Sequence, residues 1–125
     1  MIDEIKKLGK VYRTEEKEVW LEIKKENFIE AVKKMKELGV ERISAIAGID
    51  EGKNIEILYS FFHDIFITIK TSVKKEACTI PTITPYFPGA DLFERELSEM
   101  FGVKILGRKT KKLFLPEDVD KPMRK

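Results

Sequence analysis

The sequence contains very few of the residues that bind metals or form covalent intermediates. Among its 125 residues there is one cysteine, Cys78, and one histidine, His63, and they lie 15 positions apart. Metal sites usually need three or four Cys, His or carboxylate ligands at suitable spacing. We therefore expect no metal and no other cofactor. A lone cysteine also excludes an internal disulfide bond, which suits the reducing cytoplasm.

Cys78 and His63 are also poor candidates for catalysis. A cysteine nucleophile is normally activated by a nearby histidine, and only the tertiary structure could bring His63 to Cys78. His63 stands with Asp64 in a predicted tight turn, where polar residues are common for conformational reasons. The sequence has no glycine-rich phosphate loop, and a single histidine supports no Ser-His-acid set. A passive thiol and a turn histidine are the preferred interpretations, and an enzyme using either residue is the minor alternative.

Long hydrophobic runs are missing as well. No apolar stretch is long enough to cross a bilayer. The N-terminal sequence MIDEIKKLGK mixes acidic and basic side chains and lacks the apolar core of a signal peptide, so we expect no leader. These patterns favour a cytoplasmic location.

Charged residues are abundant but unevenly distributed. They make up 37% of the chain, against about 25% in typical globular domains. The net charge is only +2, so no overall field selects a partner. Residues 1–103 carry 16 Lys and Arg against 19 Asp and Glu, whereas residues 104–125 carry eight against three. We interpret 1–125 as a single domain whose segment 104–125 is a basic, extended tail.

Alternating apolar residues predict a mostly antiparallel sheet. Residues 17–24 alternate as one strand. Residues 42–49, 54–62 and 65–71 alternate too, with such short connections that they form an antiparallel meander. In 42–49 the alternation places four residues on one face: Ile43, Ala45, Ala47 and Ile49.

Helical spacing predicts two main helices. One follows Asn27 as N-cap and stops at Gly39, and residues 2–9 can form a further short turn. After the proline-rich connector 79–89, a last helix runs from Asp91, as its cap, to Gly102. Its predicted apolar arc consists of Leu92, Phe93, Leu97, Met100 and Phe101. The fold class is therefore α+β, with two main helices on one face of a mostly antiparallel sheet and an extended C-terminal arm.

The last helix carries a dense charged cluster. Glu94 suits the first helical turn because an acid there complements the helix dipole. Arg95 and Glu99 are four positions apart and can form an ion pair. Glu96 lies at the border of the apolar arc and is explained least well. An ordinary exposed face and a surface that meets another protein both remain open.

The tail also allows two interpretations. Its first half concentrates basic side chains: Lys104, Arg108, Lys109, Lys111 and Lys112. These could contact nucleic-acid phosphates. Single-strand binders normally interleave aromatic side chains, however, and only Phe114 lies among these positions. Pro116 and Pro122 favour an extended arm. A protein-docking arm is the preferred hypothesis, and a small nucleic-acid-binding module is the alternative.

The charged cluster resembles a known family signature. Residues 94–103, ERELSEMFGV, match the pattern of the complex I 30 kDa subunit family: E-R-E, two free positions, an acid, two apolar residues, then Gly with Ile or Val. The closing KPMRK at 121–125 is similar to the P-L-R-K that ends the domain in the hydrogenase-like branch. Looser similarity occurs at 88–91 and at 46–59, so the resemblance covers roughly residues 17–125.

The resemblance implies a subunit without a redox centre of its own. The family includes the 30 kDa-type subunit of NADH:quinone oxidoreductase and a small subunit of membrane-bound, energy-converting nickel–iron hydrogenases. Such a subunit packs against the catalytic large subunit and an iron–sulfur small subunit, at the cytoplasmic side of the membrane. The residues expected to contact partners are Glu94, Arg95, Glu96, Glu99, Gly102, Arg108, Lys112, Pro122, Arg124 and Lys125.

One segment departs from the respiratory pattern. After Gly107 the family typically has His-Pro-Asp and paired arginines, whereas this chain has RKTKK at 108–112. Lysine lacks the bidentate geometry of arginine, so contacts made by those arginines need not be retained. The departure and the KPMRK ending favour a hydrogenase-type assembly over a quinone reductase.

Overall fold

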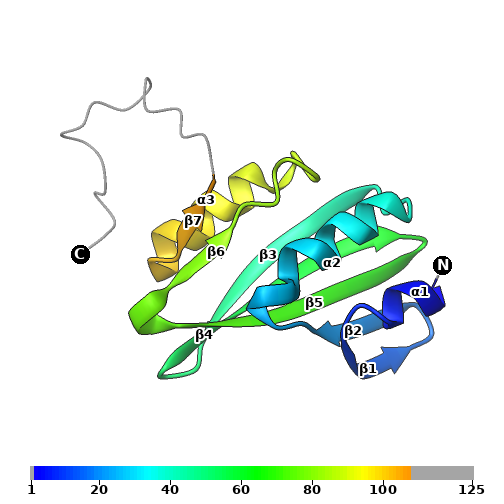
Figure 1. The fold of residues 1–125 in the computed structure, drawn as a ribbon, viewed down its shortest axis with the longest axis horizontal. Helices are drawn as coiled ribbons and strands as arrows, with labels where there is room; N and C mark the ends of the chain where they lie inside the picture. The colour runs from blue at the N-terminus through cyan, green and yellow to red at the C-terminus, as the bar shows by residue number, and fades with distance from the viewer. Residues whose placement is uncertain (1, 108–125) are drawn as a thin grey trace.

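The computed structural model describes residues 2–107 of the chain. Figure 1 shows how its helices and strands are arranged. Their bounds are α1 (Ile2–Lys6), β1 (Lys10–Glu15), β2 (Glu18–Glu22), α2 (Lys25–Glu37), β3 (Arg42–Asp50), β4 (Asn54–His63), β5 (Ile65–Lys74), the 3-10 helix η1 (Lys75–Ala77), β6 (Thr79–Pro81), α3 (Ala90–Phe101) and β7 (Lys104–Leu106). The α+β class is confirmed.

Five strands form the main sheet in the order β1-β2-β5-β4-β3. The predicted antiparallel meander β3-β4-β5 is confirmed. β2 runs parallel to β5, because α2 carries the chain across the sheet from β2 to β3. The short strands β6 and β7 form a separate parallel pair. The hairpin strand β1 was not predicted, since its residues mix charged and polar types without clear alternation.

Both main helices cover the same face of this sheet, which we call the inner face. The ring of Phe28 on α2 lies 4.6 Å from the ring of Tyr59 on β4. α3 packs on β3, where Gly48 pairs with Ile57 of β4. Tyr59 and Ile57 are two residues apart on β4 and therefore point to the same side. Apolar side chains between the helices and the inner face form the core.

The sequence predicted the wrong face for the side chains of β3 after Ile43. Ile43 is buried as expected, but Ala45, Ala47 and Ile49 are exposed on the other side of the sheet. A β-bulge between Ile43 and Ala45 inserts an extra residue and inverts the alternation that follows. A one-residue offset moves every later side chain to the opposite face.

The sequence predicted the C-terminal ends of α2 and α3 correctly but misplaced their N-terminal starts. Gly39 and Gly102 have φ of +99° and +71°, the left-handed conformation that ends α2 and α3. α2 begins at Lys25, so Asn27 lies inside it instead of capping it. α3 begins at Ala90, so Asp91 lies in its first turn. Neither N-cap residue forms a side-chain hydrogen bond, which explains why capping signals misplaced both starts.

At Gly48 the strand β3 and the helix α3 approach each other closely. A Cβ at this position would lie 2.7 Å from Cε2 of Phe101 and 3.1 Å from Cδ1 of Leu97. We expect Gly48→Val to lower the free energy of unfolding by about 1–3 kcal/mol, because the larger side chain overpacks the β3–α3 contact. Chemical denaturation checks this result. An unchanged midpoint would contradict the close packing of α3 on β3.

Candidate partner-docking site

Glu94 of α3 carries an ionisable side chain that is fully buried. Its side chain is 0% exposed, and both carboxyl oxygens accept hydrogen bonds from the connector. The Thr82 hydroxyl donates to Oε1 at 2.7 Å, and the Ile83 backbone N–H donates to Oε2 at 2.8 Å. Glu94 therefore acts inside the protein, where a direct partner contact is blocked by its own chain.

These hydrogen bonds join three segments that are distant in sequence. The Thr82 N–H donates to the Leu106 carbonyl of β7 at 2.8 Å, while the Thr82 side chain binds Glu94. The Thr84 N–H donates to the Thr82 hydroxyl at 3.2 Å. Because buried polar groups are costly when unpaired, these bonds fix the connector, β7 and α3 relative to one another. The outer face of α3 is held in position by this arrangement.

The buried side of α3 differs from the predicted arc. Its buried centre is formed by Ala90, Glu94 and Leu97, with Phe101 partly buried beside them. Leu92 is 59% exposed and Met100 is 73% exposed, so the expectation that they belong to the core was wrong. The prediction failed because we treated Glu94 as a solvent-facing residue. With Glu94 buried, the helix is rotated so that Leu92 and Met100 face the solvent. The spacing of apolar residues along a helix cannot show that a glutamate will be buried, because its two hydrogen-bond donors come from the connector.

The outer face of α3 combines exposed apolar and acidic side chains. It presents Leu92, Arg95, Glu96, Glu99 and Met100, all exposed to solvent. Arg95 pairs with Asp91 at 3.2 Å, so the predicted Arg95–Glu99 pair was wrong. Within residues 2–107, Glu96 and Glu99 form no ion pair. Two carboxylates flanked by two apolar side chains form a surface suited to a partner with cationic and apolar groups.

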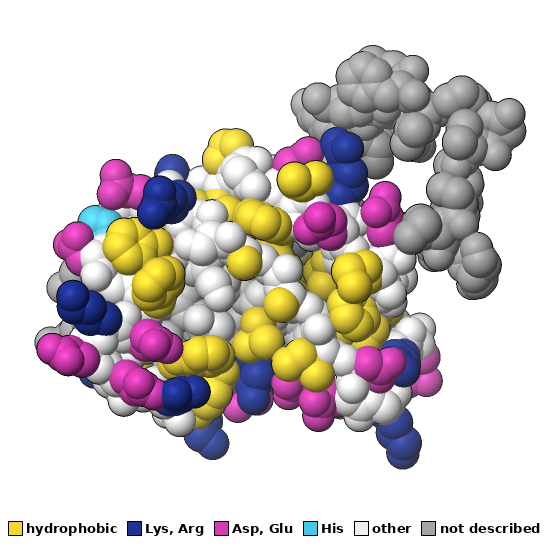
Figure 2. Space-filling model, turned by 180° about the vertical axis from the view of Figure 1, so that it is seen from behind, with side chains coloured by type: hydrophobic (Ala, Val, Ile, Leu, Met, Phe, Trp, Pro, Cys, Tyr) yellow, Lys and Arg dark blue, Asp and Glu magenta, His cyan; other side chains and the backbone are white. Residues whose placement is uncertain are grey.

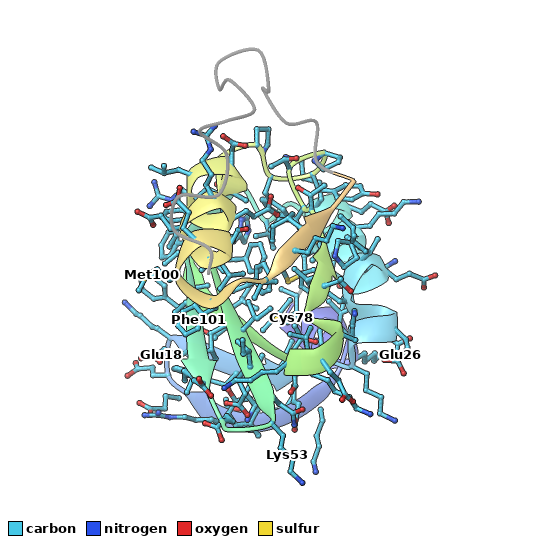
Figure 3. All side chains as sticks on the ribbon, turned by 90° about the vertical axis from the view of Figure 1, so that its left-hand side faces the viewer. Glu18, Glu26, Lys53, Cys78, Met100 and Phe101 are labelled. Atoms are coloured by element: carbon cyan, nitrogen blue, oxygen red, sulfur yellow. The ribbon has the colours of Figure 1, made fainter. Side chains whose placement is uncertain are left out.

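A cleft borders the C-terminal end of this face. Figure 3 shows Met100 and Phe101 on the same side of the protein as Cys78. The cleft has a volume of ≈ 310 Å³ and its walls include Met100, Phe101, Gly102 and Cys78. Across it, Lys75 Nζ lies 2.8 Å from Asp50 Oδ2, so this cation is already paired. The cleft can receive a partner side chain next to the exposed end of α3.

Cys78 and His63 do not come together. His63 ends β4 and Cys78 follows η1, at opposite ends of the β4–β5 hairpin. Ten-residue strands separate these ends by roughly 30 Å. His63 Nδ1 lies 4.0 Å from Glu41 Oε1. The two residues therefore do not form a nucleophile–base pair.

Two further observations concern the part of the chain from residue 2 to 107. No three His, Cys, Asp or Glu side chains are grouped there so that they could hold a metal ion. No helix of this part is long and apolar enough to span a membrane.

The remaining predicted contact residues are placed only in part. Gly102 ends α3 and leaves its neighbouring side chains on the rim of the cleft. The tail residues Arg108, Lys112, Pro122, Arg124 and Lys125 lie outside the described residues. The structure thus brings Arg95, Glu96 and Glu99 onto the outer face of α3, places Gly102 at its C-terminal end and buries Glu94 on its inner side.

Removing the Glu94 carboxyl group should destabilise the protein. We expect Glu94→Ala to lower the free energy of unfolding by about 2–3 kcal/mol, because the Thr82 hydroxyl and Ile83 N–H would lose their buried acceptor. Glu94→Gln keeps one oxygen acceptor and should cost less. Thermal and urea unfolding of both variants measure the difference. Equal stability of wild type and Glu94→Ala would contradict the structural role.

The Cys78 thiol should be slow to react. Burial raises the pKa of Cys78 above its usual value, so less thiolate is present at a given pH. We expect iodoacetamide to alkylate Cys78 more slowly than it alkylates glutathione at about pH 8. Mass spectrometry of timed samples gives both rates. Faster labelling of Cys78 would revive the hypothesis of a reactive nucleophile.

Proteins of similar sequence are subunits of quinone oxidoreductases. NAD(P)H-quinone oxidoreductase subunit J of Synechococcus sp. (strain RCC307) is 31% identical over 105 residues, which cover 73% of this chain and 59% of that protein. An NADH-quinone oxidoreductase subunit of Saccharopolyspora erythraea is 28% identical over 97 residues, covering 70% and 39%. The chain thus spans less than two thirds of the length of these relatives.

Solved structures share the fold. A chain of the membrane-bound sulfane sulfur reductase, an archaeal respiratory membrane complex, superposes with a TM-score of 0.81 at 21% identity, covering 98% of this chain and 77% of that one. The trypsin-resistant fragment (1–134) of Nqo5 superposes with a TM-score of 0.77 at 19% identity, covering 87% and 95%.

A family model covers most of the sequence. The model described as "Respiratory-chain NADH dehydrogenase, 30 Kd subunit" matches residues 21–125, which include most of the main sheet, both helices that cover it and the ERE motif. The chain therefore belongs to the family of the 30 kDa subunit of respiratory-chain NADH dehydrogenase.

Proposed function

We propose that this chain is a non-catalytic structural subunit of a complex I-like respiratory or energy-converting hydrogenase complex. In this role it docks the catalytic large subunit and an iron–sulfur small subunit, which carry the electron transfer. Family membership supports the kind of assembly. The outer face of α3 supports the docking role, because it exposes apolar and acidic side chains on a rigid helix.

The outer face of α3 is the observation that carries the proposal. Met100 and Leu92 leave most of their apolar surface in water, although each lies within a turn of a charged residue. Glu96 and Glu99 form no ion pair with any of the described residues. The hydrogen bonds to Glu94 hold the helix in place before any partner arrives. A preorganised surface loses less conformational entropy on binding than a flexible one.

The large subunit is the partner that we assign to this face. Its contacting surface would supply Lys or Arg side chains for Glu96 and Glu99 and an apolar contact for Met100. The tail, with Arg108, Lys112, Pro122, Arg124 and Lys125, would continue as an arm along the same subunit. Location at the inner face of the cell membrane would then come through the partners.

The hydrogenase-type assembly is the preferred context. The sequence RKTKK at 108–112 replaces the His-Pro-Asp turn and paired arginines that the family usually carries there. Because lysine makes single-point contacts where arginine makes bidentate ones, the partner surface for this segment should differ from that of a quinone reductase. Purification of the native assembly through this chain identifies the context by its composition. A nickel-containing large subunit would support the hydrogenase type.

Substitutions at Glu96 and Glu99 should weaken binding to the large subunit without destabilising the isolated chain. We expect the double variant Glu96→Ala/Glu99→Ala to leave the melting temperature of the isolated chain nearly unchanged, because both side chains are exposed. Its affinity for the large subunit should fall by about tenfold or more, since each carboxylate would leave a partner cation unpaired. Calorimetry or surface plasmon resonance with the purified large subunit measures the affinity.

Glu30 provides the matched control, because it is an exposed acid on α2. Glu30→Ala should change neither the melting temperature nor the affinity. Equal losses of stability and binding in the Glu96/Glu99 variant would contradict a docking role for these residues, and unchanged binding would exclude this face as the interface.

A further inference from the structure

Strand β3 forms one edge of the main sheet, and β4 is its only strand neighbour among residues 2–107. After Ile43 none of its residues is buried, whereas burial alternates along β4. Figure 1 shows β3 behind α2, so the view from behind in Figure 2 faces it. In that view the middle of the surface consists mainly of backbone and of uncharged and hydrophobic side chains. The edge of β3 is therefore accessible to another molecule.

The hydrogen-bond pattern identifies the backbone groups of β3 that point to this edge. The Glu51 N–H donates to the Asn54 carbonyl at 2.8 Å and closes the turn between β3 and β4. From there, hydrogen-bonded and non-hydrogen-bonded pairs alternate along the antiparallel ladder. Gly48 and Ile46 lie three and five residues before Glu51, so their N–H and C=O groups point away from β4. No other group in the described part of the chain forms a hydrogen bond with them.

The edge of β3 lacks the features that usually prevent a sheet from pairing with another chain. Natural edge strands carry charged side chains or prolines, or are very short. The other edge strand, β1, has three charged side chains among its six residues. β3 has nine residues, and positions 43–49 contain no charge and no proline. The bulge after Ile43 disturbs only the start of the strand. An extended strand can therefore add to this edge through backbone hydrogen bonds.

Helix α3 makes this edge continuous with the proposed docking face. Among the strands of the main sheet, α3 packs chiefly on β3. An α-helix with its side chains is about 10–12 Å wide, whereas neighbouring strands lie about 4.8 Å apart. Because α3 sits on the last strand, it extends beyond the sheet on the inner face. A strand added to β3 would lie beneath this overhang and contact the side of α3.

The same geometry excludes a second copy of this chain as the occupant. Antiparallel pairing of two β3 edges about a two-fold axis would place two α3 helices over adjacent strands. Packed helices need about 8–10 Å between their axes, which is more than the spacing of about 4.8 Å between strands. The added strand must therefore come from a protein that has no helix over that strand on the side of α3.

We infer that the large subunit adds an extended segment to the free edge of β3, next to its contact with the outer face of α3. The backbone of this segment exchanges hydrogen bonds with Ile46 and Gly48. Its side chains on the helix-free side are uncharged, because they lie beside the exposed apolar row Ala45, Ala47 and Ile49. The inference rests on the proposed function, since the segment belongs to the subunit that docks on α3.

Amide hydrogen exchange with single-residue resolution tests this pairing in the free chain and in the assembly purified through it. We expect exchange of the Ile46 and Gly48 amides to slow by about tenfold or more in the assembly, because they gain acceptors. Ala47 and Ile49 provide the matched control. Their N–H groups point to β4, so they should exchange slowly in both samples.

Hydroxyl-radical oxidation of Met100 reports on α3 in the same two samples. Protection of Met100 with unchanged exchange at Ile46 and Gly48 would overturn the strand addition and leave the proposed function intact. Absence of protection at both places would overturn both. Slow exchange of Ile46 and Gly48 in the free chain would show that this chain or a second copy fills the edge, and would also overturn the inference.

A backbone substitution at Gly48 changes the edge without adding a side chain. N-methylglycine, introduced by chemical synthesis, replaces the outward N–H by N–CH₃ and creates no Cβ that would meet Phe101. The melting temperature of the free chain should change little, because this N–H points away from β4. Affinity for the purified large subunit should fall by about tenfold or more, as measured by surface plasmon resonance. Unchanged affinity would contradict pairing at this edge.

Discussion

The buried carboxyl group of Glu94 is the interaction on which the arrangement of the C-terminal half depends. It accepts from the Thr82 hydroxyl and the Ile83 N–H, while the Thr82 N–H donates to Leu106. Beyond β6, prolines interrupt regular backbone pairing in the connector, and the Ile83 N–H donates to a side chain instead of to another strand. A side-chain acceptor from α3 supplies the missing partner. Helix α3, the connector and β7 are therefore fixed together, and one glutamate of the charged cluster is buried while its neighbours Arg95 and Glu96 face outward.

The sheet divides the protein into two unlike sides. Its inner face is filled by α2 and α3, whose apolar residues bury the centre of β4 and β5. Within the described residues, no helix covers the opposite face of the sheet. Its aromatic rings Trp20 and Tyr12 lie against the cations Arg13 and Lys70, and Lys70 also pairs with Glu56.

Several expectations from the sequence held because they depend on local physics. Alternation predicted β4 and β5, since side chains on a strand alternate between faces. Gly39 and Gly102 predicted the ends of α2 and α3, because glycine adopts positive φ without strain. Failures occurred where a distant contact decided. The bulge after Ile43 inverted the register of β3, and the burial of Glu94 rotated the buried side of α3 away from Leu92 and Met100. The order of charges in 94–99 could not reveal which acid faces inward.

By itself, the sequence determined the α+β class, the antiparallel meander, the helix stops and the family, because periodicity, glycine and the ERE motif are local properties of the chain. Only the tertiary structure decided the parallel pairing of β2 with β5, the separation of Cys78 from His63, and the burial of Glu94 beside an exposed Glu96. The physical reason is the same in each case. Burial and hydrogen-bond partners come from residues far along the chain, and no local pattern records which of two neighbouring carboxyl groups will find a buried donor.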